Sequence, residues 1–202
     1  MKKFLVSVII FLSFAEIKPQ NFKIGGSFNF MLGNKNLAYE LGPAINIEYL
    51  FDDLPISING CARFRLSALN NDTYQFSWSN DYTIYSLGTI IKYYPYKWDI
   101  EPYIAYGLFY NSFNSNSSGH PTFINGFIIS PKIDKNNLSS EITAGLILTA
   151  KTPVNIVFEV TQSFNKLDYD LIMLDSDYNK KTLKEEFNFN ALFIKLGVRF
   201  SL

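Results

Sequence analysis

Residues 191–202, at the end of the chain, read ALFIKLGVRFSL. Large apolar side chains occupy every second position, and Lys195 and Arg199 lie between them. Because side chains alternate between the two faces of a β-strand, this stretch predicts a strand with one apolar face and one face that carries two cations. A soluble protein would bury the apolar face in a core. A transmembrane barrel would turn it toward lipid and turn the cations toward the lumen.

The composition narrows the class of protein. The chain has 202 residues, enough for one domain with a sizeable interior. Lys+Arg and Asp+Glu both number 18, and this zero formal charge argues against a nucleic-acid-binding protein. Aromatic residues make up 17% of the chain, which is typical of barrels with aromatic girdles at both membrane interfaces. A single cysteine, Cys61, and a single histidine, His120, exclude an intrachain disulfide and a Cys- or His-rich metal cluster.

The first residues have the features of a targeting signal. Two lysines follow Met1, and residues 4–14 form an apolar run that is too short to span a bilayer as a helix. Ser13 and Ala15 supply small residues at the −3 and −1 positions of a cleavage site. We therefore expect residues 1–15 to be a signal peptide and residues 16–202 to form one outer-membrane β-barrel domain. No later run of about 20 apolar residues is present, so any membrane crossing would use strands.

The alternation of apolar and polar residues recurs along the chain and predicts an eight-stranded antiparallel up-and-down barrel. The expected strands are residues 22–32, 39–51, 56–68, 82–94, 100–112, 138–150, 154–164 and 191–202. Tilted strands of about 9–11 residues are long enough to cross the hydrocarbon core. Short turns at residues 52–55, 95–99 and 151–153 define one rim. The links on the other rim, residues 33–38, 69–81, 113–137 and 165–188, are mostly long, which is the outer-membrane pattern.

The charges separate by strand face. The apolar phase of the eight strands carries no charge, and the other phase carries six cations and five anions, among them Glu40. A charge facing lipid near the bilayer midplane costs about 2–4 kcal/mol, so the apolar phase should face lipid. We expect the other phase to form a lumen charge network of Lys23, Glu48, Arg63, Arg65, Lys92, Glu101, Glu141, Glu159, Lys195 and Arg199.

Buried ions need partners, so the network should consist of ion pairs. Lys195 is expected to pair with Glu159 or Glu141. Arg199 is expected to pair with Glu101 or Glu48. Because eight strands leave an interior just wide enough for side chains, we predict a plugged lumen rather than an open pore.

Two stretches carry a resemblance to a known family. They are Tyr94-Pro95 followed by Glu101-Pro102-Tyr103-Ile104-Ala105-Tyr106-Gly107, and the closing Leu196-Gly197-Val198-Arg199-Phe200. Residues 22–202 resemble the small eight-stranded outer-membrane β-barrel family of the OmpA/OmpX type. The resemblance implies a barrel in the cell outer membrane of a Gram-negative bacterium. It also implies a C-terminal insertion signal formed by Leu196, Val198, Phe200 and Leu202, although members of the family usually end on an aromatic residue.

Three further features are candidate sites. His120 lies near Ser115, Ser117 and Ser118, as in a Ser–His hydrolase, but flanking Gly119 and Pro121 favour an exposed loop histidine. Cys61 lies in the inward phase beside Arg63, where a small filling residue is favoured over a reactive thiol. The carboxylates of the last link could bind Ca²⁺, but a solvated loop or a hairpin beyond the membrane is favoured. These carboxylates are Asp168, Asp170, Asp175 and Asp177.

An aromatic group surrounds the second short turn. We expect it to form the periplasmic girdle. Its members are Tyr93, Tyr94, Tyr96, Trp98 and Tyr103.

The sequence thus predicts a non-enzymatic outer-membrane barrel that acts in surface interaction or envelope structure through residues 113–137 and 165–188. The alternatives are a narrow channel or transporter for small solutes, an outer-membrane lipid-modifying enzyme, and a secreted barrel of the lipocalin type. We expect no catalytic residues, no cofactor and no metal. The expected partners are outer-membrane lipids and lipopolysaccharide, the outer-membrane insertion machinery, and an extracellular protein or surface ligand, with no nucleic acid.

Overall fold

The computed structural model describes residues 21–33, 37–73, 76–96, 99–115, 122–124, 127–130, 135–149, 153–174 and 179–201. The first strands are β1 (Phe22–Gly33), β2 (Leu37–Leu50), β3 (Ile56–Thr73), β4 (Phe76–Tyr93), β5 (Ile100–Ser115) and β6 (Thr122–Ile124). The others are β7 (Phe127–Ser130), β8 (Lys135–Leu148), β9 (Val154–Phe164), β10 (Lys166–Leu174), β11 (Lys180–Asn188) and β12 (Ala191–Ser201). The predicted signal peptide, Trp98, His120, Asp175, Asp177 and Leu202 lie outside the described residues.

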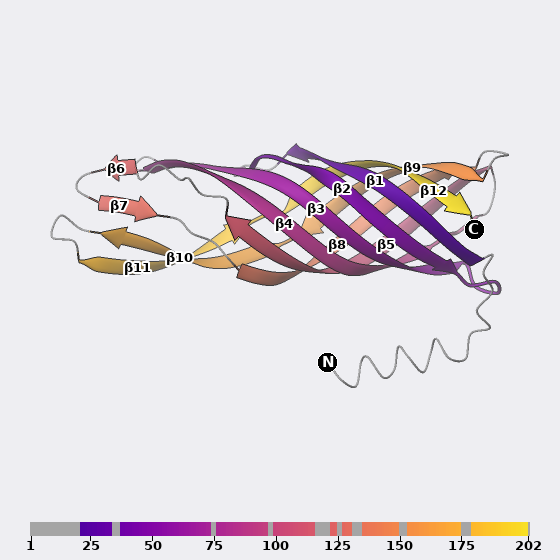
Figure 1. Cartoon of the computed structure of the whole chain (residues 1–202). Coiled ribbons are helices and arrows are strands. Elements are labelled where there is room, and N and C mark those ends of the chain that lie inside the picture. Colours follow the sequence, from indigo (N-terminus) through magenta and orange to yellow (C-terminus); the bar gives the residue numbers. More distant parts are fainter. Residues whose placement is uncertain are drawn as a thin grey trace, which may run out of the picture.

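Eight of these strands form a closed antiparallel barrel in the order β1-β12-β9-β8-β5-β4-β3-β2 (Figure 1). The barrel closes where β1 pairs with β12, with Ile24 opposite Phe200 and Asn29 opposite Lys195. The predicted eight-stranded up-and-down barrel is confirmed. Within the described residues, no helix is long and apolar enough to cross a membrane.

The exterior of the barrel is apolar all the way round. Each of the eight strands exposes large apolar side chains on its outer face, in the phase that the sequence predicts. Examples, one from each barrel strand in chain order, are Phe30, Ile45, Phe64, Leu87, Ile104, Ile142, Ile156 and Leu196. A continuous apolar exterior around a closed barrel is the arrangement that lipid requires, because closure leaves no unpaired strand edge in the hydrocarbon.

The strands are longer than expected at the end of the barrel opposite the short turns. The sequence predicts a link at residues 69–81, but β3 and β4 continue their ladder as far as Thr73 opposite Phe76. The links at 113–137 and 165–188 also contain strands: β6, β7, β10 and β11 form a separate sheet in the order β11-β10-β7-β6. Polar residues occur in both phases there, so the alternation that marks a membrane strand is lost while backbone pairing continues.

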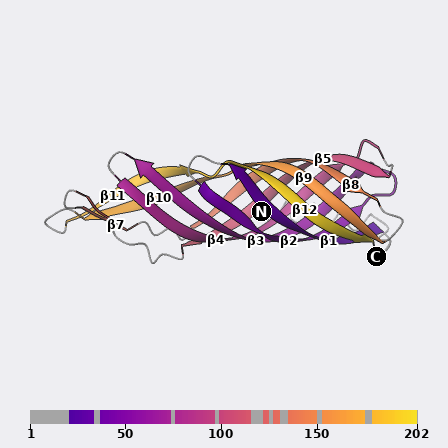
Figure 2. The same ribbon diagram turned by 90° about the horizontal axis from the view of Figure 1, so that it is seen from above.

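Figures 1 and 2 show this second sheet projecting past the barrel, at the end away from the C-terminus. We call this the hairpin end, and the opposite end, with the turns between β2 and β3, β4 and β5, and β8 and β9, the short-turn end. The ladder of β10 and β11 runs from Lys166 opposite Asn188 to Leu174 opposite Lys180. The barrel thus carries a β-structured extension rather than only loops.

The prediction that these aromatic residues form a girdle at the membrane interface is wrong for Tyr94 and Tyr103. Tyr93 and Tyr96 are exposed on the outside at the short-turn end, as expected. Tyr94 and Tyr103 are only 3% and 2% exposed and belong to a buried cluster inside the barrel. Tyr103 lies in the inward phase of β5, and its hydroxyl finds an acceptor there, so the interior offers both apolar contact and a hydrogen bond.

Candidate functional site: the lumen

The lumen of the barrel holds the charged residues in three successive layers. Nearest the short-turn end, Glu48 on β2 accepts hydrogen bonds from the hydroxyls of Ser57, at 2.5 Å, and Tyr94. Its second oxygen lies 3.7 Å from both Lys92 Nζ and Arg199 Nη1. The other end of the Arg199 guanidinium donates to Glu101, at 3.1 Å.

Glu141 on β8 is the centre of the second layer. Arg63 Nη1 lies 2.5 Å from one oxygen of this carboxylate, and Lys195 Nζ lies 3.1 Å from the other. Arg63, Glu141 and Lys195 are all buried. Because charges out of water are stable only when paired and hydrogen bonded, each member of this cluster depends on the others.

Glu159 connects the first two layers. Its carboxylate lies 3.9 Å from Lys195 Nζ and 4.0 Å from Lys92 Nζ, and it accepts a hydrogen bond from the Tyr103 hydroxyl. Lys92 also lies over the ring of Tyr103, with Nζ 4.8 Å from the centroid. The ion pairs therefore run without a break across both layers.

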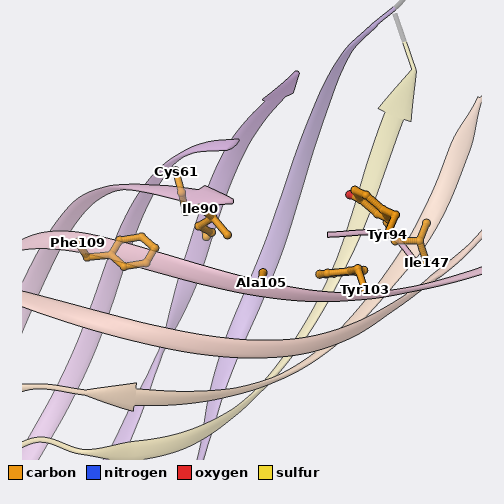
Figure 3. Packing of buried hydrophobic residues seen from close by; sticks show 8 residues of the cluster. Cys61, Ile90, Tyr94, Tyr103, Ala105, Phe109 and Ile147 are labelled. Atoms are coloured by element: carbon orange, nitrogen blue, oxygen red, sulfur yellow. The ribbon is translucent and has the colours of Figure 1, made fainter. Parts of the chain in front are cut away.

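The aromatic ring of Phe109 packs against the second layer. The guanidinium carbon of Arg63 lies 3.7 Å from the centroid of Phe109, a cation–π contact. Arg63 Nε also donates to Cys61 Sγ, at 3.3 Å, so the thiol is a buried filling group of the lumen. Figure 3 shows Phe109, Cys61 and the neighbouring apolar side chains inside the barrel.

The third layer, toward the hairpin end, combines an ion pair with amides. Arg65 pairs with Glu40 and donates to Ser86 Oγ and Asn111 Oδ1, at 2.9 and 3.1 Å. Asn111 in turn donates to Asn137, at 3.1 Å. Asn137 donates onward to Asn165 Oδ1 and, at 2.7 Å, to the backbone carbonyl of Lys166. This chain of amides links the lumen to the first residue of β10.

A layer of apolar side chains covers the third charged layer. The rings of Phe113 and Phe189 have centroids 5.0 Å apart. Every member of the layer is at most 2% exposed. The members are Tyr82, Ile84, Phe113, Phe189 and Phe193. Buried apolar side chains thus lie beyond the third charged layer, toward the hairpin end.

The predicted network residues all lie on the inner face, but the sequence analysis left out some of their neighbours. Glu40, which was not assigned to the network, is the partner of Arg65. Lys23 donates to Ser201 Oγ, at 2.7 Å, rather than to a carboxylate. The lumen aromatics were missed because the charge pattern does not mark them. In the structure a glycine lies opposite each ring, Gly88 opposite Phe109 and Gly145 opposite Tyr103, but only the strand register brings each pair together.

Within the part of the chain that the structure describes, the remaining candidates from the sequence do not come together in a second site. Leu196, Val198 and Phe200 point outward at 50%, 39% and 43% exposure, and their role in insertion stays a prediction. Asp168 and Asp170 lie on β10 opposite Glu186 and Lys184. Among the described residues, no group of three or more His, Cys, Asp or Glu side chains is arranged to hold a metal ion.

Solved structures share this architecture. OprG of Pseudomonas aeruginosa superposes with a TM-score of 0.66 at 13% identity, covering 90% of this chain and 95% of that one. The Neisserial surface protein NspA gives 0.56 at 12% identity, covering 90% and 97%. A major outer membrane protein of Thermus thermophilus gives 0.53 at 13% identity, covering 90% and 99%.

The chain has the fold of a small outer-membrane β-barrel. The resemblance to the eight-stranded outer-membrane barrels is thus confirmed at the level of the fold. No protein-family model and no curated protein sequence matches the chain. At 12–13% identity the similarity to these structures concerns the fold, and the function must be argued from this chain's own residues.

Proposed function

We propose that the protein is an integral outer-membrane barrel with a plugged lumen, whose role is non-enzymatic. In this proposal the barrel anchors the sheet of β6, β7, β10 and β11 outside the membrane for surface interaction or for envelope structure. The short-turn end and the chain termini would face the periplasm, as in the outer-membrane pattern of short periplasmic turns and longer extracellular connections. Outer-membrane lipids and lipopolysaccharide would surround the apolar exterior.

The buried charged and aromatic side chains of the lumen are the observation that supports the proposal. Arg63, Glu141 and Lys195 form a buried ion cluster across the middle of the barrel. Toward the hairpin end, Phe113 and Phe193 are 0% and 2% exposed. A permeating ion would have to displace both layers. Breaking a buried ion pair costs several kcal/mol, so we expect no resting conductance.

Planar-bilayer recordings test the plug. The wild-type protein should insert without stable channel steps at moderate voltage. An Arg63→Ala/Glu141→Ala/Phe113→Ala/Phe193→Ala variant, which opens both layers and leaves Lys195 beside Glu159, should give measurable steps. A variant with three exterior alanines, Leu87→Ala/Leu108→Ala/Leu146→Ala, is the matched control and should stay silent. Stable conductance from the wild-type barrel would show that the lumen is a channel for small solutes.

The sheet of β6, β7, β10 and β11 supports the proposed role in interaction at the cell surface. Its strands pair through β7 and β10, with Ile172 opposite Ser130 and Leu174 opposite Ile128, so it is an ordered platform on the side away from the short turns. Hairpins that are held in a sheet lose less conformational entropy on binding than free loops do.

Deletion of the hairpin tests this role. A variant in which a short turn replaces residues 166–188 should still show heat-modifiable migration on a detergent gel, because the barrel ladder is intact. Wild-type protein in nanodiscs should bind intact cells or purified lipopolysaccharide, and the deletion variant should lose that binding. Equal binding by both proteins would refute a surface role for the sheet.

Export and insertion are part of the same proposal. Residues 1–15 would be removed as a signal peptide, so the mature protein should begin at Glu16 by intact-mass spectrometry of the membrane fraction. Leu196, Val198 and Phe200 would present the outward apolar ridge that the insertion machinery reads. A Phe200→Ser substitution should slow assembly in reconstituted membranes without affecting secretion.

A further inference from the structure

We propose that the lumen binds one small monovalent anion, of the size of chloride, in a cavity near the short-turn end. The cavity has a volume of about 20 Å³ and lies between β1, β2, β3, β4, β9 and β12. A volume of about 10–15 Å³ is enough for one water-sized particle. The polar side chains that line it are Lys23, Ser27, Asn46, Glu48, Asn59, Lys92, Glu159 and Arg199.

Arg199 supplies hydrogen-bond donors with no acceptor. The residue is 6% exposed, and its Nε and Nη1 atoms have no hydrogen-bond partner, although Nη2 is bonded to Glu101. The nearest carboxylate oxygen to Nη1 is that of Glu48, at 3.7 Å. A buried donor without an acceptor destabilises the fold, and more so when it is charged, so an acceptor in the cavity would stabilise the fold.

Lys92 lines the same cavity. Its ammonium lies 3.7 Å from Glu48 and 4.0 Å from Glu159, in both cases beyond ordinary hydrogen-bond length. An anion between Lys92 and Arg199 would contact both cations directly. Gly25 and Gly197, which carry no side chain, also line this part of the cavity.

The charges around the cavity favour an anion over a water molecule. Its lining carries Lys23, Lys92 and Arg199 against Glu48 and Glu159, and Glu101 also pairs with Arg199; over the whole lumen six cations face five anions. Lys23 lies at the start of β1 and bonds to Ser201, so it marks the mouth of the cavity at the short-turn end. Water would fill the volume and leave the extra positive charge, whereas a monovalent anion fills the volume and neutralises the charge.

The same features set the size and valence of the ligand. A cavity of about 20 Å³ is large enough for a single water or a small ion. The two carboxylates in the lining would repel a dianion. The buried Asn59 Oδ1 atom has no hydrogen-bond partner and is an acceptor, so it would accept a hydrogen bond from a water beside the ion rather than contact the ion itself.

Bromide is the direct probe. Crystals of the full chain grown in sodium bromide should show an anomalous scattering peak inside the barrel, between Lys92 and Arg199. The Arg199→Lys variant keeps the charge but removes the free guanidinium donors, and it should lose most of that peak. An ordered water at the position, without anomalous signal, would overturn the proposal. Bromide peaks confined to the outer surface would mean an adventitious ion only, which also overturns it.

Stability in solution gives a second test that needs no crystal. The refolded barrel should unfold at a higher temperature in sodium chloride than in sodium gluconate at equal ionic strength, by about 2–4 °C, with a saturable dependence on chloride. Lys23→Gln removes a cation at the mouth with little effect on folding, and it should weaken the apparent chloride affinity several-fold. Lys135→Gln, an exposed cation outside the cavity, is the matched control. Identical melting in the two salts for the wild-type barrel would refute the anion site.

Discussion

Tyr103 lies over Gly145 on the neighbouring strand. A Cβ atom built on Gly145 would come 2.2 Å from Tyr103 Cζ and 2.5 Å from its hydroxyl oxygen. The two residues are direct partners in the ladder of β5 and β8. The glycine therefore sets the position of the ring. The ring in turn places its hydroxyl on Glu159, the carboxylate that joins two layers of the lumen network.

Gly145→Ala should destabilise the barrel. The added methyl group overlaps the Tyr103 ring, which must move and release Glu159. Overpacking of this kind costs about 1–3 kcal/mol. Urea unfolding in lipid vesicles measures the change. Gly33→Ala is the matched control, because a Cβ there meets nothing within 4 Å. Equal stability of the two variants would show that Tyr103 is not held by the glycine.

The barrel could be predicted from the sequence because lipid imposes a strict alternation on every strand. β9, for example, has the bounds Val154–Phe164 that the pattern indicates. Outside the membrane this constraint is absent. In β11 the exposed positions Thr182, Lys184, Glu186 and Asn188 give no apolar phase to follow. For this reason the sequence pattern predicts links where the structure has the strands of the second sheet.

The lumen could be predicted only in part, for a related reason. A charged side chain is tolerated inside the barrel but not against lipid. The strand phase alone therefore places Arg63 and Glu141 in the interior, although it does not give the distance between them. Apolar residues of the inward phase, such as Ile90 and Phe109, give no such signal, because apolar groups are tolerated on both faces of the wall. Their packing depends on which residue lies across the ladder, and that register is known only from the structure.

Glu141→Gln should cost the barrel about 3–5 kcal/mol, because it leaves the buried cations Arg63 and Lys195 without their shared carboxylate. Adding Arg63→Met removes one of the two orphaned charges and should recover much of the loss. Unfolding of both single variants and the double variant in vesicles gives the coupling energy. Additive losses would mean that the pair is not coupled.

Lys166 and Glu186 form an exposed ion pair on the projecting sheet, which can be compared with the buried ion pairs of the lumen. Their side chains are exposed and lie 2.7 Å apart. The hydrogen bond and charge of Glu186 raise the pKa of Lys166 above its usual value. Any stability from this pair is fully present below the ordinary lysine pKa and is lost as pH rises through the higher folded value. In Glu186→Gln the Lys166 pKa should fall, as followed by NMR of ¹³C-dimethylated lysines. Barrel unfolding at neutral pH should be unchanged, in contrast to Glu141→Gln.

Leu87→Arg tests which face of the wall meets lipid. Leu87 is 66% exposed, lies near the middle of β4 within the barrel and pairs with Ala62 and Tyr110 on the adjacent strands. An arginine facing the bilayer midplane should cost about 2–4 kcal/mol. Thr182→Arg on β11 adds the same charge outside the barrel and should leave stability unchanged. Unfolding in vesicles should therefore separate the two variants, whereas in a soluble barrel both exposed positions would accept arginine at little cost. Equal tolerance would place Leu87 in water rather than in the bilayer.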